Sequence, residues 1–257
     1  MYLEGDWDIF EGQVFNEWRR DKHVITEIGY PLKLCKKVIG FDWGYAAPGC
    51  AIWIAITPEN QFGVSRAFVY RELYQNKKTP EEWAQAIKSF TSVEPVNYLV
   101  LPHDCYVKEG RESIAEVFRR IIGIAQRPAR TLQKDARKNR VAITHNYLAV
   151  AEDGKPQLQV HINCKNLIRT LPELIYSQSN PEDVDTDGED HAYDALSIAL
   201  MTHLQHTLES GPVKAEMKNK TDIQHFPHDE KGEIIGFDLD KFKEEMKFPQ
   251  KRNWEYT

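Results

Sequence analysis

Short apolar segments separated by turn residues characterise the first third of the chain. Residues 37–42 predict a short strand that ends at Asp42, and the wholly apolar residues 50–56 predict a strand buried on both faces. Residues 66–73 predict a third strand, after Pro58 and Asn60 have turned the chain. Because the connections between these strands are short, we expect them to form an antiparallel meander.

The following part of the chain alternates between helical and extended patterns. Thr79-Pro80-Glu81-Glu82 combines a capping residue, a proline and two acids, which is typical of the start of a helix. The predicted order is helix 79–90, strand 96–101, helix 113–122, an extended piece 128–132, helix 136–150, strand 157–162, and helices 165–176 and 190–206. This pattern indicates an α/β fold, in which a mixed sheet carries helices on its faces.

Composition divides the chain of 257 residues into three parts. Residues 1–30 contain irregularly spaced aromatic side chains, which indicate an ordered lead-in segment. Residues 31–208 contain the predicted sheet and helices, and a chain that is 41% hydrophobic can bury one sizeable core. Residues 209–257 are densely charged with scattered apolar positions, which indicates a weakly packed tail or a docking segment.

The apolar segments also bear on where the protein works. The longest of them, residues 50–56, is too short to cross a bilayer, and no charged-then-apolar signal peptide opens the sequence. The four cysteines are widely spaced, without a C-x-x-C pair, as is typical of reduced thiols. We therefore expect a protein of the cytoplasm with no membrane partner.

The charged residues are unevenly distributed, although the net charge is only −6. Residues 182–194 hold seven acidic residues and no Lys or Arg, whereas residues 127–140 hold six basic residues and one acid. We call these six residues the basic strip: Arg127, Arg130, Lys134, Arg137, Lys138 and Arg140. Such a strip could follow a DNA backbone without reading bases, and the alternative is an ordinary solvated helix face.

Two aspartates follow predicted strands. Asp42 ends the strand 37–42, and Asp104 comes shortly after the strand 96–101. Neighbouring strand ends can bring two carboxylates within a few ångströms, where like charges raise each other's pKa unless a cation neutralises them. The alternative is that each aspartate simply begins a turn, as Asp often does.

A third acidic group stands at the predicted start of a helix. Asp190, His191 and Asp194 share one side of that helix, and Asp194 lies deeper, beside apolar residues, where an ionised side chain needs a partner. We expect Asp194 to be the third ligand and Asp190 an auxiliary group. Carboxylates from two strand ends and a helix suit Mg²⁺ or Mn²⁺, and two such ions can promote phosphodiester hydrolysis. The predicted metal site comprises Asp42, Asp104, Asp190, His191 and Asp194.

A competing motif overlaps this group. Asp183-Val184-Asp185-Thr186-Asp187-Gly188 matches the opening of a calcium loop of the EF-hand kind, with Asp194 at the twelfth position. That position normally carries Glu, and Pro181 interrupts the helix that should enter the loop. An acidic, solvated loop is the simpler interpretation.

These acidic motifs resemble those of one known family. Val38-Ile39-Gly40-Phe41-Asp42-Trp43-Gly44, the strand before Asp104, and Asp190-His191-Ala192-Tyr193-Asp194-Ala195-Leu196 are similar to the three motifs of nuclease domains of bacteriophage terminase large subunits. The segment from Gly154 to Ile168 also resembles the family's connecting turn, strand and helix, so that the likeness covers roughly residues 1–208.

The resemblance implies a ribonuclease-H-like fold and a metal-dependent endonuclease that cuts concatemeric viral DNA at the start and end of packaging. By position, it implies that Asp42, Asp104 and Asp194 are the catalytic acids and that His191 is adjacent to the metal. Asp190 matches an acid that only some members have. The second motif continues here with Cys105-Tyr106-Val107-Lys108, where the family often has small and acidic residues.

The family also implies partners. Its members carry an amino-terminal ATPase motor, whereas this chain has no G-x-x-x-x-G-K-[ST] phosphate loop, so we expect a nuclease fragment that works with such a motor domain. Besides double-stranded DNA, the implied partners are the capsid portal and the small terminase subunit. Two alternatives stay open: a Holliday-junction resolvase or integrase-like nuclease of the same fold, and a non-catalytic module that binds structural calcium.

Overall fold

The computed structural model describes residues 12–60, 64–92, 94–108, 110–129, 135–151 and 153–210, with side chains up to residue 204. The chain divides into two units, residues 1–211 and residues 212–257, and every described residue belongs to the first. The predicted tail, residues 209–257, lies outside the described residues except for the end of the last helix.

The structure confirms the predicted α/β class, with a mixed sheet flanked by helices. The strands are β1 (Val24–Ile25), β2 (Lys36–Asp42), β3 (Gly49–Ile56), β4 (Ala67–Gln75), β5 (Tyr98–Leu101), β6 (Gln126–Pro128) and β7 (Leu158–His161). The α-helices are α1 (Arg20–His23), α2 (Pro80–Thr91), α3 (Ile114–Ile122), α4 (Ala136–Leu148), α5 (Lys165–Thr170) and α6 (His191–Ser210). Three short 3-10 helices, η1 (Leu32–Leu34), η2 (His103–Tyr106) and η3 (Leu171–Glu173), complete the described elements.

The seven strands lie in the order β1-β7-β4-β3-β2-β5-β6. β2, β3 and β4 form the predicted antiparallel meander, while β5 pairs in parallel with β2 and β7 in parallel with β4. Because β2 and β5 are parallel neighbours, their carboxyl ends lie at the same edge of the sheet. Asp42 and Asp104, which follow those ends, are thereby brought to one edge.

Successive side chains along each strand point to opposite faces of the sheet, so the strands contribute to two separate cores, one on each face. On β3, Cys50, Ile52 and Ile54 belong to one core, whereas Ala51 and Trp53 belong to the other. This is why residues 50–56 are apolar at every position rather than at every second one: β3 is a central strand that is covered on both faces.

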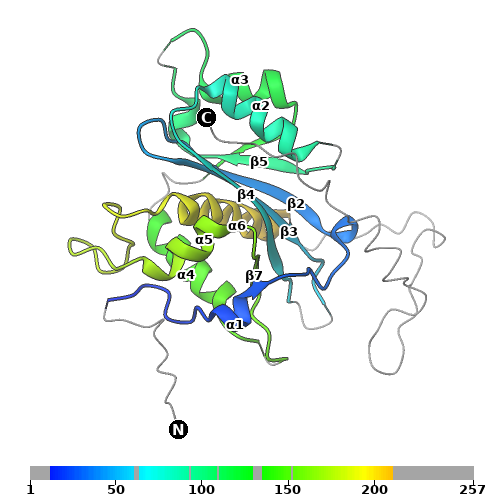
Figure 1. Cartoon of the computed structure of the whole chain (residues 1–257), viewed down its shortest axis with the longest axis vertical. Coiled ribbons are helices and arrows are strands. Elements are labelled where there is room, and N and C mark those ends of the chain that lie inside the picture. Colours follow the sequence, from blue (N-terminus) through cyan, green and yellow to red (C-terminus); the bar gives the residue numbers. More distant parts are fainter. Residues whose placement is uncertain are drawn as a thin grey trace, which may run out of the picture. The chain divides into compact units, whose positions relative to one another are not determined.

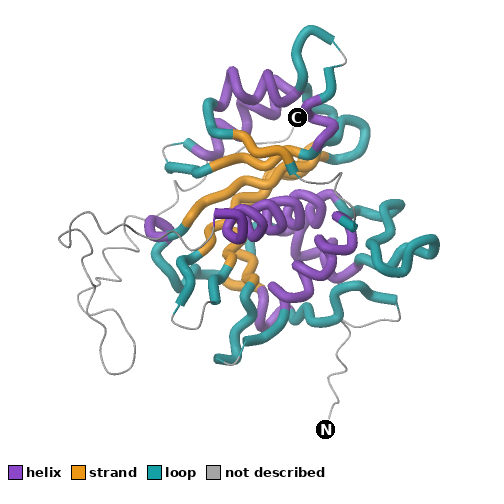
Figure 2. The backbone as a smooth tube through the Cα atoms, turned by 180° about the vertical axis from the view of Figure 1, so that it is seen from behind, coloured by secondary structure: helices purple, strands orange, loops and turns teal. Residues whose placement is uncertain are grey.

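Helices cover both faces, as Figure 1 shows: α2 and α3 lie on one side of the sheet, and α4, α5 and α6 on the other. Figure 2 shows the same layers from behind, with helices on both sides of the strands. α2 and α3 each begin with a capping box, formed by Thr79 with Glu82 and by Ser113 with Glu116. Within the described ranges, no helix is both long and apolar enough to cross a membrane.

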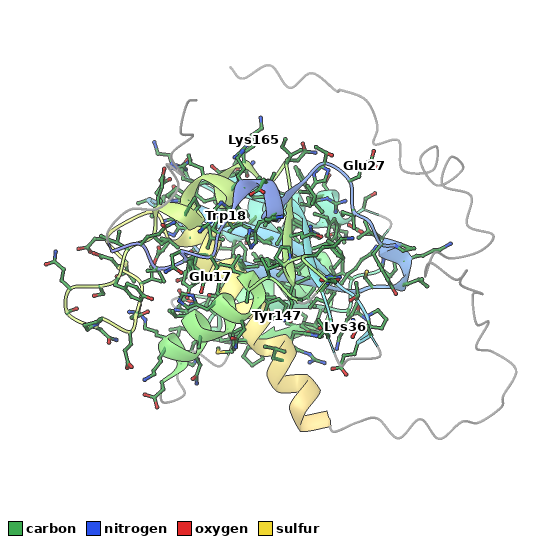
Figure 3. The ribbon with its side chains drawn as sticks, turned by 90° about the horizontal axis from the view of Figure 1, so that it is seen from below. Glu17, Trp18, Glu27, Lys36, Tyr147 and Lys165 are labelled. Carbon is green, nitrogen blue, oxygen red and sulfur yellow. The ribbon has the colours of Figure 1, made fainter. Side chains whose placement is uncertain are left out.

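Residues 12–30 pack into the same unit as the sheet. Val14, Phe15 and Trp18 are buried in the core on the α6 side, and β1 extends the sheet by pairing with β7. His23 is fully buried, with its Nε2 atom 2.9 Å from the Leu148 carbonyl oxygen. Figure 3 labels Glu17 and Trp18 on this segment, beside the helices of that face. The described part of the predicted lead-in is thus an integral layer of the fold.

One predicted helix is shorter than expected. The pattern predicted a helix over residues 165–176, but α5 ends at Thr170 and a single 3-10 turn follows. Pro172 explains the difference, since proline has no backbone N–H and its ring clashes with the preceding helical turn.

Candidate metal centre

Asp42 is the last residue of β2, and the alternation of the strand directs it toward the face covered by α6. Gly40, two residues earlier on the same face, lies directly under that helix: an added Cβ atom would be 1.9 Å from the Ala195 carbonyl oxygen. No larger residue would leave room for this approach. The close packing of α6 on Gly40 therefore brings the beginning of the helix to the end of β2.

The first residues of α6 contact Asp42 directly. His191 Nδ1 lies 3.1 Å from Asp42 Oδ2 and 3.9 Å from Asp190 Oδ1. The backbone N–H of Asp194 donates to the Asp190 carbonyl oxygen at 2.8 Å, which places Asp194 one turn further along. The structure thus unites Asp42 with the predicted group on α6, 149 residues away in the sequence from Asp42 to His191.

The burial of the two α6 aspartates is the reverse of what the sequence suggested. α6 begins at His191, so Asp190 precedes the helix, and its Oδ1 atom lies 3.9 Å from His191 Nδ1. Its side chain is 10% exposed, whereas that of Asp194 is 25% exposed. Asp190 is therefore a buried member of the group, and not the solvated one that its first-turn position predicted.

Burial and neighbouring negative charges raise the pKa of two of the carboxyl groups, those of Asp42 and Asp190. Burial raises the pKa of Asp42 to about 6, the hydrogen bond from His191 opposes the rise, and the negative charges of Asp194 and Asp104 add to it. Burial, followed by the charge of Asp194, raises the pKa of Asp190 to about 7. The hydrogen bond to Asp42 in turn raises the pKa of His191 above its ordinary value. These residues form one electrostatic unit.

Asp104 joins this unit from a different support. It lies in η2, just after β5, and its side chain is exposed. Its Oδ1 atom accepts a hydrogen bond from the neighbouring Cys105 backbone N–H at 2.9 Å. Asp104 is close enough for its charge to affect Asp42, as its like charge contributes to the raised pKa of that residue. We call Asp42, Asp104, Asp190, His191 and Asp194 the carboxylate site.

Asp194 has a cationic partner that the sequence reading assigned elsewhere. Arg140, on α4, donates from NH1 to Asp194 Oδ1 at 2.8 Å and to Ser197 Oγ at 3.3 Å. The Arg140 side chain is only 7% exposed. The structure therefore buries Arg140 against α6 instead of exposing it with the rest of the strip, and its contact with the DNA backbone stays a prediction. In the sequence, the available signals were an aspartate among apolar helix residues, which needs a partner, and an arginine 54 residues away.

The other members of the basic strip are dispersed. Arg127 lies on β6 with its guanidinium 4.1 Å from the centre of the Tyr98 ring. Arg137 pairs with Asp183 at 2.9 Å, and Lys138 pairs with Glu182. Arg130 and Lys134 lie outside the described residues. Much of the described positive charge of α4 thus faces the acidic segment 182–194.

The same ion pairs bear on the calcium-loop alternative. Asp183, its first predicted ligand, is almost fully buried and binds Arg137 and its neighbour's backbone N–H instead. Asp185 accepts from the Asp187 backbone N–H, as in an ordinary Asx turn. The described residues before Asp183 form turns and an isolated bridge rather than an entering helix. This geometry does not fit an EF-hand.

The donor set of the carboxylate site fits a hard divalent cation. In the described ranges, no three His, Cys, Asp or Glu side chains lie close enough together to hold one ion as they stand. The chemistry nevertheless favours Mg²⁺ or Mn²⁺, which prefer carboxylate oxygens. Burial first, and then the like charges of Asp194 and Asp104, raise the pKa of Asp42, and a cation would relieve that repulsion.

Comparisons with known proteins agree with this architecture. No protein-family model and no curated protein sequence matches the chain. Among solved structures, the large terminase nuclease domain of phage P22 is similar at a TM-score of 0.58 and 14% identity, over 76% of this chain and 93% of that one. The cobalt-bound large terminase nuclease of the thermophilic phage G20c matches at a TM-score of 0.52 and 16% identity, over 75% of this chain and 98% of that one.

A longer protein matches over part of its length. The large terminase of the thermophilic bacteriophage D6E is similar at a TM-score of 0.58 and 14% identity, over 75% of this chain. The matched region spans only 46% of the D6E protein, which is less than half of that chain. The region shared with the P22 and G20c domains is nearly the whole of each. The chain therefore has the ribonuclease-H-like fold of large terminase nuclease domains.

Proposed function

We propose that this chain is a metal-dependent DNA endonuclease that cuts concatemeric viral DNA during genome packaging. The observation that carries the proposal is the gathering of Asp42, Asp104 and Asp194 at one sheet edge, in the fold of large terminase nuclease domains. The bound cobalt of the G20c domain, a protein with this fold, supports a divalent metal.

In this proposal Asp42, Asp104 and Asp194 hold two Mg²⁺ or Mn²⁺ ions, with His191 and Asp190 beside them. When bound, such ions supply an activated water and stabilise the leaving oxygen of the phosphodiester. The protein holds and orients the metal ligands. β2 and α6 are rigid supports for Asp42 and Asp194, and His191 Nδ1 lies 3.1 Å from one Asp42 oxygen and restrains it. Cys105, the residue after Asp104, is buried and therefore cannot serve as a nucleophile in this site.

Double-stranded DNA would lie across this edge of the sheet. We assign backbone contacts to Arg137 and Lys138, together with Arg130 and Lys134 outside the described residues. The predicted contact of Arg127 would lie away from this edge, because its guanidinium lies over Tyr98, the first residue of β5, at the opposite end of the strands. Arg137 and Lys138 would exchange their present partners, Asp183 and Glu182, for phosphates. An ATPase motor domain, the portal and the small terminase subunit would complete the packaging machine.

Plasmid nicking tests the proposal. Supercoiled plasmid should be cut with little sequence preference in Mn²⁺ or Mg²⁺, and EDTA should stop the reaction. Asp42→Asn, Asp104→Asn and Asp194→Asn should each abolish cutting, whereas the matched change Asp185→Asn in the acidic segment should not. Robust cutting in excess EDTA would overturn the assignment. A strong preference for branched DNA over plasmid would favour a resolvase of the same fold.

A further inference from the structure

We propose that Arg140 is a positioning residue that orients Asp194 and balances part of the negative charge of the carboxylate site. This inference rests on the proposed function, because it assigns Asp194 as a metal ligand. It changes the role of Arg140 from a contact with DNA to a built-in cation of the site.

The geometry is that of a support rather than a surface contact. Arg140 NH1 reaches both Asp194 Oδ1, at 2.8 Å, and Ser197 Oγ, at 3.3 Å, so one nitrogen bridges two successive positions on the same side of α6. The guanidinium also lies 6.0 Å from the centre of the Tyr193 ring. With the side chain 7% exposed, the position of Arg140 is determined by α6 on one side and by its own helix on the other.

Its own helix holds Arg140 in place as well. The Thr144 hydroxyl donates to the Arg140 carbonyl oxygen at 2.9 Å, one turn along α4. Arg137, one turn earlier, anchors the start of α4 to Asp183. Three ion pairs, each with its cation on α4, therefore join this helix to residues 182–194, and the pair of Arg140 ends on the proposed metal ligand Asp194.

The two oxygens of Asp194 are consequently different. Oδ1 accepts from Arg140, while Oδ2 accepts no hydrogen bond from the part of the chain that the structure describes. Arg140 thus holds one oxygen and leaves the other for a cation.

The ion pair of Arg140 with Asp194 also offsets negative charge in the carboxylate site. Asp42, Asp190 and Asp194 lie close enough for their negative charges to repel one another, and the buried Arg140 contacts one of them, Asp194. Removing one partner of a buried ion pair leaves an uncompensated charge, which is strongly unfavourable. Arg140 would therefore keep the site assembled before a metal ion arrives.

The test compares Arg140→Met and Arg140→Lys with the matched control Arg120→Met on α3, whose arginine is 53% exposed and pairs with the exposed Glu112. Melting temperatures are measured in EDTA and in Mn²⁺, and plasmid nicking gives kcat and KM separately. We expect Arg140→Met to melt lower in EDTA and to recover part of that loss in Mn²⁺, because the ion supplies positive charge that the site has lost. Its kcat should fall by about tenfold or more with KM nearly unchanged, as for other groups that orient metal ligands.

Arg140→Lys keeps the positive charge on a shorter side chain, so it should restore most of the melting temperature and part of kcat. If Arg140→Met does not fold, Arg140→Lys alone should still lower kcat without raising KM. An equal loss of melting temperature in EDTA and Mn²⁺ would reduce Arg140 to a packing role. A raised KM, together with a shallower salt dependence of DNA binding, would show that Arg140 contacts DNA and does not position Asp194. The melting data do not require cutting, so an inactive wild-type chain would count against the nuclease and not against this pair.

Discussion

The two sides of the carboxylate site are supported in different ways. On the α6 side, Asp42 ends a central strand, His191 binds it, and Asp194 is held by the buried Arg140. On the η2 side, Asp104 is exposed on a 3-10 turn, and its carboxylate accepts from the backbone of the next residue. One side is therefore preorganised by tertiary contacts, and the other by local geometry alone.

This difference indicates how a cation would complete the site. A ligand on a packed strand or helix keeps its position when its neighbours change, whereas a ligand on an exposed turn can reorient at small cost. We infer that Asp104 adjusts when metal binds and that the α6 side does not. The first three predictions below change a residue on the α6 side and use a residue on or near the η2 side as the reference.

Gly40→Ala should have the largest effect, because the added Cβ would lie 1.9 Å from the Ala195 backbone oxygen. The helix has to move off β2, at a cost in unfolding free energy of about 3 kcal/mol or more. Cutting should be lost as Asp194 leaves Asp42. The control is Gly110→Ala, near Asp104, where an added Cβ meets nothing within 4 Å. Equal stability of the two variants in urea unfolding would show that α6 does not depend on Gly40.

Asp194→Asn and Asp104→Asn should both stop cutting, yet differ in stability. Asp194→Asn removes the charged partner of the buried Arg140 and should cost about 2 to 3 kcal/mol in metal-free protein. Asp104→Asn removes an exposed charge and should change the unfolding free energy by less than about 0.5 kcal/mol. Urea unfolding in EDTA measures both. A neutral Asp194→Asn would mean that Arg140 finds another partner.

Asp42→Asn should stabilise the metal-free protein at pH 8 by about 1 to 2 kcal/mol, since it removes a partly buried charge that its neighbours repel. The sign follows from the raised pKa of Asp42, about 6. Its stabilising contribution is complete below the ordinary pKa, when the carboxyl is protonated, and is lost as the pH rises through about 6. The raised pKa of His191 acts in the same direction.

The measurement is the unfolding free energy of both proteins from about pH 5 to pH 8 in EDTA. The advantage of Asp42→Asn should shrink toward the acid end. Asp104→Asn serves as the reference from the other side of the site. A difference that does not vary with pH would contradict the coupling of the α6-side carboxylates.

Neutralising Arg137 and Lys138 together, as Arg137→Gln and Lys138→Gln, should have the smallest effect. Each lost phosphate contact lowers the slope of log affinity against log salt by about 0.9. In the free protein both residues are already paired with acidic side chains. Breaking those ion pairs offsets part of the binding free energy that the phosphate contacts supply. The control is Lys165→Gln on α5, which Figure 3 shows pointing away from the molecule. An unchanged slope in DNA-binding titrations would show that Arg137 and Lys138 do not contact phosphates and belong to an ordinary solvated helix face.

Much of the fold was predictable because it depends on local patterns. The apolar run of residues 50–56, the capping boxes at Thr79 and Ser113, and the alternation before Asp42 each act within a few residues. The membership of the carboxylate site was inferred in the same way, since strand ends and a helix start are local features. Its assignment as a metal centre stays a prediction.

The partners within the site were decided only by the tertiary structure. Arg140 looked like one more cation of a basic strip, and its true neighbour, Asp194, is 54 residues away. Gly40 looked like an ordinary strand residue until α6 was found to pack on it. Residues 12–30 showed no regular period, yet Val14, Phe15 and Trp18 are buried in the core on the α6 face. The physical reason is shared by all three: a sequence pattern records which side chains need burial or a counter-charge, whereas the packing of distant elements selects the residue that supplies it.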